Sequence, residues 1–224
     1  MDDMTDAMAA APPSLEEIGR QPADDGAKRR QIMEGARATF MAAGFDAASM
    51  NDIARAAGVS KGTLYAYFDS KVALFEALIR EERVHQPERN IAFPADEPDP
   101  AQALSIYGRR LVAKITRTDA LELARVVAAS AAKFPRLGQA FYEAGPQFGV
   151  GALKRGLDGF VAAGTLRVDD TTLAARLFID MCLGDILKRL LFRVVEAIPQ
   201  EEVDRVVDRS VAMFVAYYGV PPNP

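Results

Sequence analysis

The sequence predicts an all-α protein, in which an N-terminal module of three helices is followed by a larger helical domain. After about residue 28, apolar residues recur at three- to four-residue spacing, which is typical of amphipathic helices. Strict alternation of apolar and polar residues is missing, and the stretch 165–168 is too short to argue for a sheet. Glycines and prolines interrupt the helical pattern at intervals, so most of the expected helices have a defined end.

The composition indicates a soluble globular protein, because 50% of the 224 residues are hydrophobic and 26% are charged. The chain has one cysteine, Cys182, and one histidine, His85, too few for an internal disulfide or a structural zinc site. We therefore expect a reducing cytoplasmic location and neither a metal nor a cofactor. The N-terminus lacks the pattern of a secretory signal, and no run reaches the roughly 18 apolar residues of a membrane span.

The net charge of −4 is unevenly distributed along the chain. Residues 1–27 contain seven acidic groups and one arginine, whereas the other 197 residues contain 26 basic and 24 acidic groups. This first segment is rich in Ala, Pro and Asp and has no sustained periodicity, so we expect a disordered acidic extension. Residues 28–72 are predicted to form the three-helix module, and residues 73–224 the larger domain.

Helix-start and helix-stop signals are clear in the N-terminal module. A first helix is predicted from about residue 30 to 43, ending at Gly44. A second begins after Ser49 as N-cap and closes at Gly58, which supplies a left-handed residue. Ser60 is the expected N-cap of a third helix, and a longer helix follows over about 71–86.

Four prolines between residues 87 and 100 exclude a continuous helix there and mark a boundary loop. Beyond it, the remaining helices are predicted over about 101–117, 119–133, 135–144, 146–163, 170–193 and 200–218.

The segment 49–71 places two short helices on either side of the link Gly58-Val59-Ser60, the arrangement of a helix-turn-helix. In that motif the start of the second helix faces the bases of the major groove. Lys61, Gly62 and Thr63 offer there a charge, a position without a side chain and a hydroxyl, so backbone amides can approach phosphates closely. Two ordinary core helices joined by a glycine turn are the simpler alternative.

Side chains of this third helix are expected to divide between the core and the surface. Leu64 and Phe68, four residues apart, should face inward, which directs Tyr65 and Tyr67 away from the core and toward phosphate oxygens. Partial burial of both tyrosines is an open alternative. The module is locally basic, with seven basic and four acidic groups over 28–71. Arg29 and Arg30 could reach a neighbouring groove or simply be solvated.

The segment IARAAGVSKGTLYAYFDSKVALF, residues 53–75, strongly resembles the DNA-binding module of the TetR family. The resemblance covers about residues 29–76. It implies that six residues hold DNA, while Ser49 stands where the family often has threonine and Ser60 caps the recognition helix. These six are Lys61, Gly62, Thr63, Tyr65, Tyr67 and Lys71.

Three segments of the C-terminal part are similar to the AefR-like subgroup of this family: AAKFPRL (131–137), FYEAGP (141–146) and AGTLRVDD (163–170). Known settings of that subgroup include efflux and quorum-related genes. Only the architecture is carried over to this chain.

Together, these patterns favour a bacterial transcription regulator that binds a palindromic operator as a homodimer. The resemblance implies a repressor released by a small-molecule effector, although activation stays open. The apolar helices over 170–193 and 200–218 are the expected dimer contacts, with Gly184 permitting close approach. An effector pocket is expected around four residues, although such a stripe is more often core. These residues are Phe141, Phe148, Phe178 and Met181.

Two other classes of function compete with this interpretation. A helical small-molecule binding or interaction protein without DNA-binding activity fits the modest basic excess. An enzyme fits less well, because the sequence has no nucleophile–base set and no phosphate-binding glycine loop. The spacing of Glu82 and His85 is that of a di-iron ligand pair, but such a site needs a second histidine.

Overall fold

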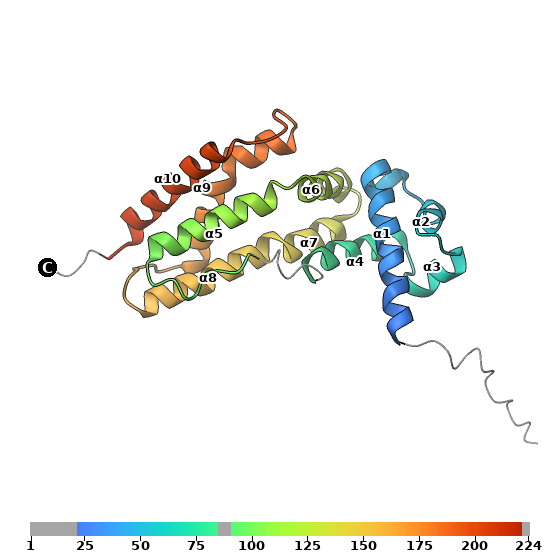
Figure 1. Cartoon of the computed structure of the whole chain (residues 1–224), viewed down its shortest axis with the longest axis horizontal. Helices are drawn as coiled ribbons and strands as arrows, with labels where there is room; N and C mark the ends of the chain where they lie inside the picture. The colour runs from blue at the N-terminus through green and yellow to red at the C-terminus, as the bar shows by residue number, and fades with distance from the viewer. Residues whose placement is uncertain (1–21, 85–90, 221–224) are drawn as a thin grey trace, which may run out of the picture.

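The computed structural model describes residues 22–84 and 91–220, and it confirms the all-α class. Figure 1 shows an elongated molecule with α1 to α4 at one end and α5, α8, α9 and α10 along the other. An isolated antiparallel bridge between Leu166 and Gly219 is the one β feature among these residues. The helices are α1 (Pro22–Ala47), α2 (Met50–Ala56), α3 (Lys61–Tyr67), α4 (Lys71–Val84), α5 (Pro100–Ile115), α6 (Thr118–Ala131), α7 (Pro135–Ala144), α8 (Pro146–Ala162), α9 (Thr171–Leu191) and α10 (Gln200–Tyr218).

The predicted start of the first helix is wrong. Helix α1 begins at Pro22, so the last part of the segment 1–27, expected to be disordered, belongs to this helix; residues 1–21 lie outside the described residues. A proline in the first turn, followed by acidic residues at the positive end of the helix dipole, favours this start. The predicted stop is confirmed, because Gly44 leaves the helical conformation with φ 75° and ψ 169°.

The predicted helices of the C-terminal domain agree with the observed bounds of α5 to α10 to within two residues. Proline occupies the first position of α5, α7 and α8, where its missing N–H costs no helical hydrogen bond. Local sequence signals are therefore sufficient to set these ends.

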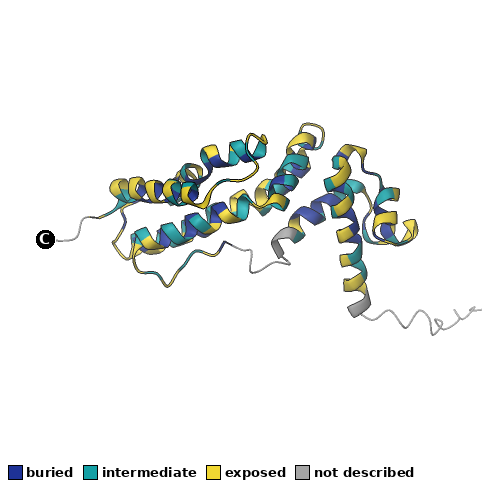
Figure 2. Ribbon diagram, turned by 45° about the horizontal axis from the view of Figure 1, so that its top comes forward, coloured by how far each residue is buried: buried dark blue, intermediate teal, exposed yellow. Residues whose placement is uncertain are grey.

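Two hydrophobic clusters hold the helices together. The first joins α1 to α4 and extends past the predicted boundary at residue 72, because it includes Leu123 and Val127 of α6 and Leu137 and Ala140 of α7. The second fills the space between α5, α8, α9 and α10. In Figure 2 the helices are blue on faces turned toward other helices and yellow on outer faces. Packing thus couples α4, α6 and α7 to the N-terminal module.

No helix in the described ranges has the combined length and apolarity needed to cross a lipid bilayer. The same residues bring no group of three His, Cys, Asp or Glu side chains into metal-binding proximity. His85 lies outside the described residues, so the structure says nothing of its surroundings.

Candidate nucleic-acid interface and ligand groove

Two serines start the short helices of the N-terminal module, as the sequence predicts. Ser49 Oγ accepts a hydrogen bond from the backbone N–H of Asp52 at 3.2 Å, and Ser60 Oγ accepts one from that of Thr63 at 3.0 Å. Gly58 between the helices has φ 62°, the left-handed conformation that glycine adopts without strain. These two N-cap hydrogen bonds stabilise the starts of both helices of the helix-turn-helix.

The start of α3 presents a bare surface to solvent. Lys61 and Gly62 are exposed, Tyr65 is 43% exposed, and Leu64 beneath them is fully buried. The Lys61 ammonium lies 5.9 Å from the centroid of the Tyr65 ring. A Cβ at Gly62 would meet only Ser60 Oγ, at 3.8 Å, so packing within the protein does not require glycine there. The exposed surface of α3 therefore combines a cation, a phenol and unobstructed backbone.

The other hydroxyl-bearing residues of α3 are already engaged. Thr63 Oγ1 lies 2.7 Å from Ser60 Oγ, and the hydroxyl of the half-buried Tyr67 donates to the carboxylate of Asp25 on α1. The phenol that we expected to face a phosphate is thus held by an acidic group in this conformation. The open alternative, partial burial, describes Tyr67 better than Tyr65.

Arg29 makes two contacts within the folded chain. Its guanidinium pairs with Glu81 of α4 and lies 5.5 Å from the centroid of the Phe68 ring. Arg30 is exposed. The Arg29 side chain keeps 40% of its surface exposed despite these contacts, so both arginines remain accessible to solvent.

Lys71 does not point outward as a phosphate contact would. Its ammonium donates to three backbone carbonyls at the end of α1 and just beyond it, those of Phe45 at 2.7 Å, Asp46 at 3.1 Å and Ala48 at 2.8 Å. It also lies 4.6 Å from the centroid of the Phe45 ring. Burial lowers the pKa of Lys71, and the charge of Asp46 opposes that shift. Since all three N–H groups are used, Lys71 caps the end of α1 in this structure.

We expect Lys71→Met to destabilise the N-terminal module by about 2 kcal/mol, because it leaves carbonyls without a charged donor. Urea unfolding followed by circular dichroism measures this change. Lys133→Met is the matched control: Lys133 also lies over a phenylalanine ring, but its side chain is 67% exposed and should contribute less than about 1 kcal/mol. If Lys71→Met kept the wild-type stability and its DNA binding depended less on salt, Lys71 would instead contact a DNA phosphate.

A close approach of α1 and α2 supports the motif from behind, and the sequence analysis missed it. Gln31 Nε2 donates to the carbonyl of Ala57 at 2.7 Å. A Cβ built on Gly35 would lie 2.5 Å from the backbone nitrogen of Ala57, nearer than real contacts allow. A glycine inside a helical pattern was the available signal, because such a glycine usually has a packing reason.

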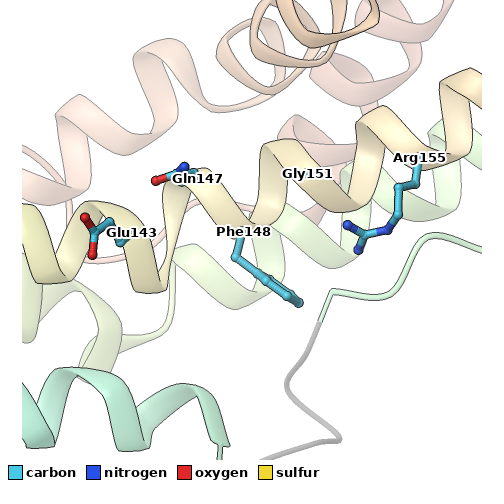
Figure 3. A pocket seen from close by; sticks show the side chains of 5 residues that line it. All are labelled: Glu143, Gln147, Phe148, Gly151 and Arg155. Atoms are coloured by element: carbon cyan, nitrogen blue, oxygen red, sulfur yellow. The ribbon is translucent and has the colours of Figure 1, made fainter.

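The four residues predicted to line an effector pocket are divided between the two hydrophobic clusters and a surface groove. Phe178 is fully buried and packs edge-on against Phe214 at 5.5 Å, while Met181 packs against the second cluster and Phe141 against the first. Only Phe148 lines a surface groove, of about 400 Å³. An apolar helical stripe cannot distinguish core from pocket, because both need the same spacing. The groove, shown in Figure 3, is formed by Glu143, Gln147, Phe148, Gly151 and Arg155.

Helices α9 and α10 each carry exposed apolar side chains. Leu173 and Leu177 are 50% and 46% exposed on α9, and Met213 and Tyr217 are 64% and 81% exposed on α10. Each pair is four residues apart, so each lies on one face of its helix. A Cβ at Gly184 would face open space. We call this surface, defined by these four apolar side chains, the α9–α10 face.

Two family profiles match the chain and together cover most of it. Residues 32–78 match the profile described as bacterial regulatory proteins, tetR family. Residues 102–220 match the C-terminal domain described as that of AefR-like transcriptional repressors.

Individual curated relatives match over part of the chain. The chain is 45% identical over 56 residues to the HTH-type transcriptional repressor Rv1474c of Mycobacterium tuberculosis, covering 25% of this chain and 30% of that protein. It is 34% identical over 97 residues to a probable acrEF/envCD operon repressor of Escherichia coli, covering 42% of this chain and 44% of that protein. The chain thus spans less than half the length of these curated relatives.

Solved structures match over nearly the whole length. The flavonoid-responsive regulator FrrA superposes with a TM-score of 0.79 at 30% identity, covering 88% of this chain and 100% of that one. A TetR-family regulator from Mesorhizobium loti has a TM-score of 0.79 at 29% identity, covering 87% and 98%. With more than half of the chain matched by the C-terminal profile alone, this protein belongs to the TetR family of bacterial regulators and carries an AefR-like C-terminal domain.

Proposed function

We propose that this chain is a transcriptional repressor that binds a palindromic operator as a homodimer and is released by a small-molecule effector. The observation that carries the proposal is the exposed start of α3. Lys61, Gly62 and Tyr65 are exposed there, on a helix whose Leu64 is fully buried. A rigid short helix with a bare, cationic N-terminal end fits the major groove. Membership of the TetR family, and the similarity to repressors of Mycobacterium tuberculosis and Escherichia coli, support the same function.

The α9–α10 face supports the homodimer. One recognition helix contacts only a few base pairs, so two modules related by a two-fold axis are needed for a specific site. A two-fold interface uses the same patch on both partners, and a face with leucines on one helix and Met213 and Tyr217 on the other can pack against itself. The predicted dimer helices are those that carry this face.

Effector release is supported by the coupling of α6 and α7 to the N-terminal module through the first hydrophobic cluster. A ligand that favours a different arrangement of these helices would shift the dimer away from the DNA-binding state. The name of FrrA, a flavonoid-responsive regulator, makes flavonoid-like phenols the first ligands to try. Activation in place of repression is the alternative within the same class.

Selection of bound fragments from genomic DNA by the purified protein, at two salt concentrations, tests the proposal. We expect a palindrome, with affinity falling steeply as salt rises because phosphates are contacted. Tyr65→Ala should lose the enrichment. Tyr142→Ala, which removes a 50% exposed tyrosine from α7, should keep it. No enrichment by a folded wild-type dimer would favour the rival function, a helical small-molecule binding protein without DNA-binding activity.

We expect Gly62→Ala to separate folding from DNA binding. The free protein has room for the methyl group, so stability should stay the same or rise by up to about 1 kcal/mol. Operator affinity should fall about tenfold, because the methyl group would hold the backbone away from the phosphates. Fluorescence anisotropy with labelled operator measures the affinity. Gly159→Ala, at an exposed position of α8 with open space around it, should leave that affinity unchanged.

We expect Asp25→Asn to tighten operator binding by about threefold, and more at low salt. The substitution removes a negative charge beside α3 and replaces the charged acceptor of the Tyr67 hydroxyl with a neutral amide oxygen, which holds the hydroxyl less strongly. Glu34→Gln removes one charge from an exposed position farther along α1 and should change affinity less. Weaker binding by Asp25→Asn would mean instead that the carboxylate positions Tyr67 for DNA.

A further inference from the structure

The groove crosses the joint between α7 and α8. Glu143 belongs to the last turn of α7, whereas the other lining residues belong to α8. Gly145 separates the two helices, and Pro146 begins α8; Gly145 has φ −112° and ψ −85°, which interrupts the helical path. A molecule held on both sides of this joint would therefore fix the angle between α7 and α8.

The lining offers three kinds of contact. Phe148 and Arg155 extend from the same side of α8 with Gly151 between them (Figure 3). Because Gly151 has no side chain, a flat ring can lie against the helix there; a Cβ at that position would be 3.7 Å from the Arg155 guanidinium. Glu143 and Gln147 add hydrogen-bonding groups at the other end of the groove.

The opposite charges of Arg155 and Glu143 limit the class of ligand that fits the groove. Arg155 attracts an oxygen with negative charge, while the Glu143 carboxylate repels an anion and accepts hydrogen bonds from hydroxyl groups. Phenolic hydroxyls both donate and accept, so one molecule can satisfy both ends of the groove. A volume of about 400 Å³ is within the usual range for small-molecule sites.

We propose that the groove across the α7–α8 joint binds a planar, polyhydroxylated aromatic effector, and that α7 transmits its binding to the DNA-binding module. The proposal rests on the proposed function, which supplies the response that the ligand controls. The ring stacks on Phe148, one phenolic oxygen accepts from Arg155, and another hydroxyl donates to Glu143.

The other end of α7 reaches the N-terminal module directly. Arg136 pairs with the buried Glu76 of α4: its Nη2 donates to Oε2 at 3.3 Å, and its Nε lies 3.0 Å from Oε1 without hydrogen-bond alignment. Phe134, the residue before α7, packs edge-on against Phe45 at 4.9 Å. The carbonyl of Phe45 is one of those bound by Lys71. A change in the direction of α7 therefore acts on α4 and on the end of α1.

Isothermal titration of the full-length protein with a trihydroxyflavone and with unsubstituted flavone tests the site. We expect binding of the trihydroxyflavone only, with Kd raised at least about tenfold in both Phe148→Ala and Arg155→Gln. Arg110→Gln, at an exposed position of α5, is the control and should bind like wild type. Equal binding of the two flavones, unchanged binding by both groove variants or no binding by wild type would overturn the proposal.

Transmission is tested by operator binding with and without the trihydroxyflavone. The double variant Glu76→Gln/Arg136→Gln removes the pair without leaving a buried charge unpaired. It should bind the trihydroxyflavone and the operator like wild type, but the trihydroxyflavone should release it from the operator much less. Full release in the double variant would overturn the role of α7. If the wild-type protein did not bind operator, the proposed function would be wrong. The titration would still show whether the groove binds the trihydroxyflavone.

Discussion

Gly35→Ala is expected to lower the free energy of unfolding of the N-terminal module by about 3 kcal/mol, because the overpacking involves backbone and not a movable side chain. The new Cβ would lie 2.5 Å from the nitrogen and 2.6 Å from Cα of Ala57. Relief requires α1 and α2 to separate, which would also weaken the hydrogen bond from Gln31 to the carbonyl of Ala57. Urea unfolding and operator affinity should both report the loss.

Gly26→Ala provides the matched control within the same helix. Gly26 is exposed, and a Cβ there would meet nothing within 4 Å. Alanine should therefore stabilise α1 by up to about 1 kcal/mol, through the smaller entropy of the unfolded chain. The prediction is wrong if Gly35→Ala and Gly26→Ala both unfold at the same urea concentration as wild type. In that case the extra methyl group at residue 35 would fit between α1 and α2 without cost.

Leu177→Asp combined with Met213→Asp is expected to convert the protein from dimer to monomer at micromolar concentration. Each substitution places a carboxylate in a surface that the proposed dimer buries. Removing that charge from water costs several kcal/mol. The isolated subunit should keep its fold, because these side chains are 46% and 64% exposed. Sedimentation velocity measures the mass, and binding to the full palindrome should weaken by at least about a hundredfold.

Tyr142→Asp controls for the added charge, since it alters a 50% exposed aromatic residue on α7, outside the α9–α10 face. It should sediment like wild type. A double variant that remains dimeric would place the interface elsewhere and would remove the main support for the two-fold arrangement of the recognition helices.

Much of the local structure could be predicted from the sequence. The caps at Ser49 and Ser60, the turn at Gly58 and the proline-led starts of α5, α7 and α8 all depend on residues within a few positions of each other. The segment 53–75 is also sufficient to indicate the family. Such signals are reliable because the hydrogen bonds of a cap or a turn are made with backbone groups only a few residues away.

The roles of several site residues could not be predicted. Lys71, Arg29 and Tyr67 are polar residues in a basic module, and their partners lie 23 or more residues away in sequence. No local pattern states whether such a side chain will meet a backbone carbonyl, a carboxylate or solvent. The position of an effector pocket could not be predicted for a similar reason, because the buried Phe178 and the groove residue Phe148 both belong to apolar patterns with helical spacing.

By itself, the sequence determined the helical class, the helix bounds of the C-terminal domain, the helix-turn-helix and the family. These follow from short-range rules of periodicity, capping and turn formation. Only the tertiary structure decided which lysine is a cap, which glycine permits α1 and α2 to touch, and where the groove lies. Those depend on which distant segments meet, and that is set by packing of whole helices against one another.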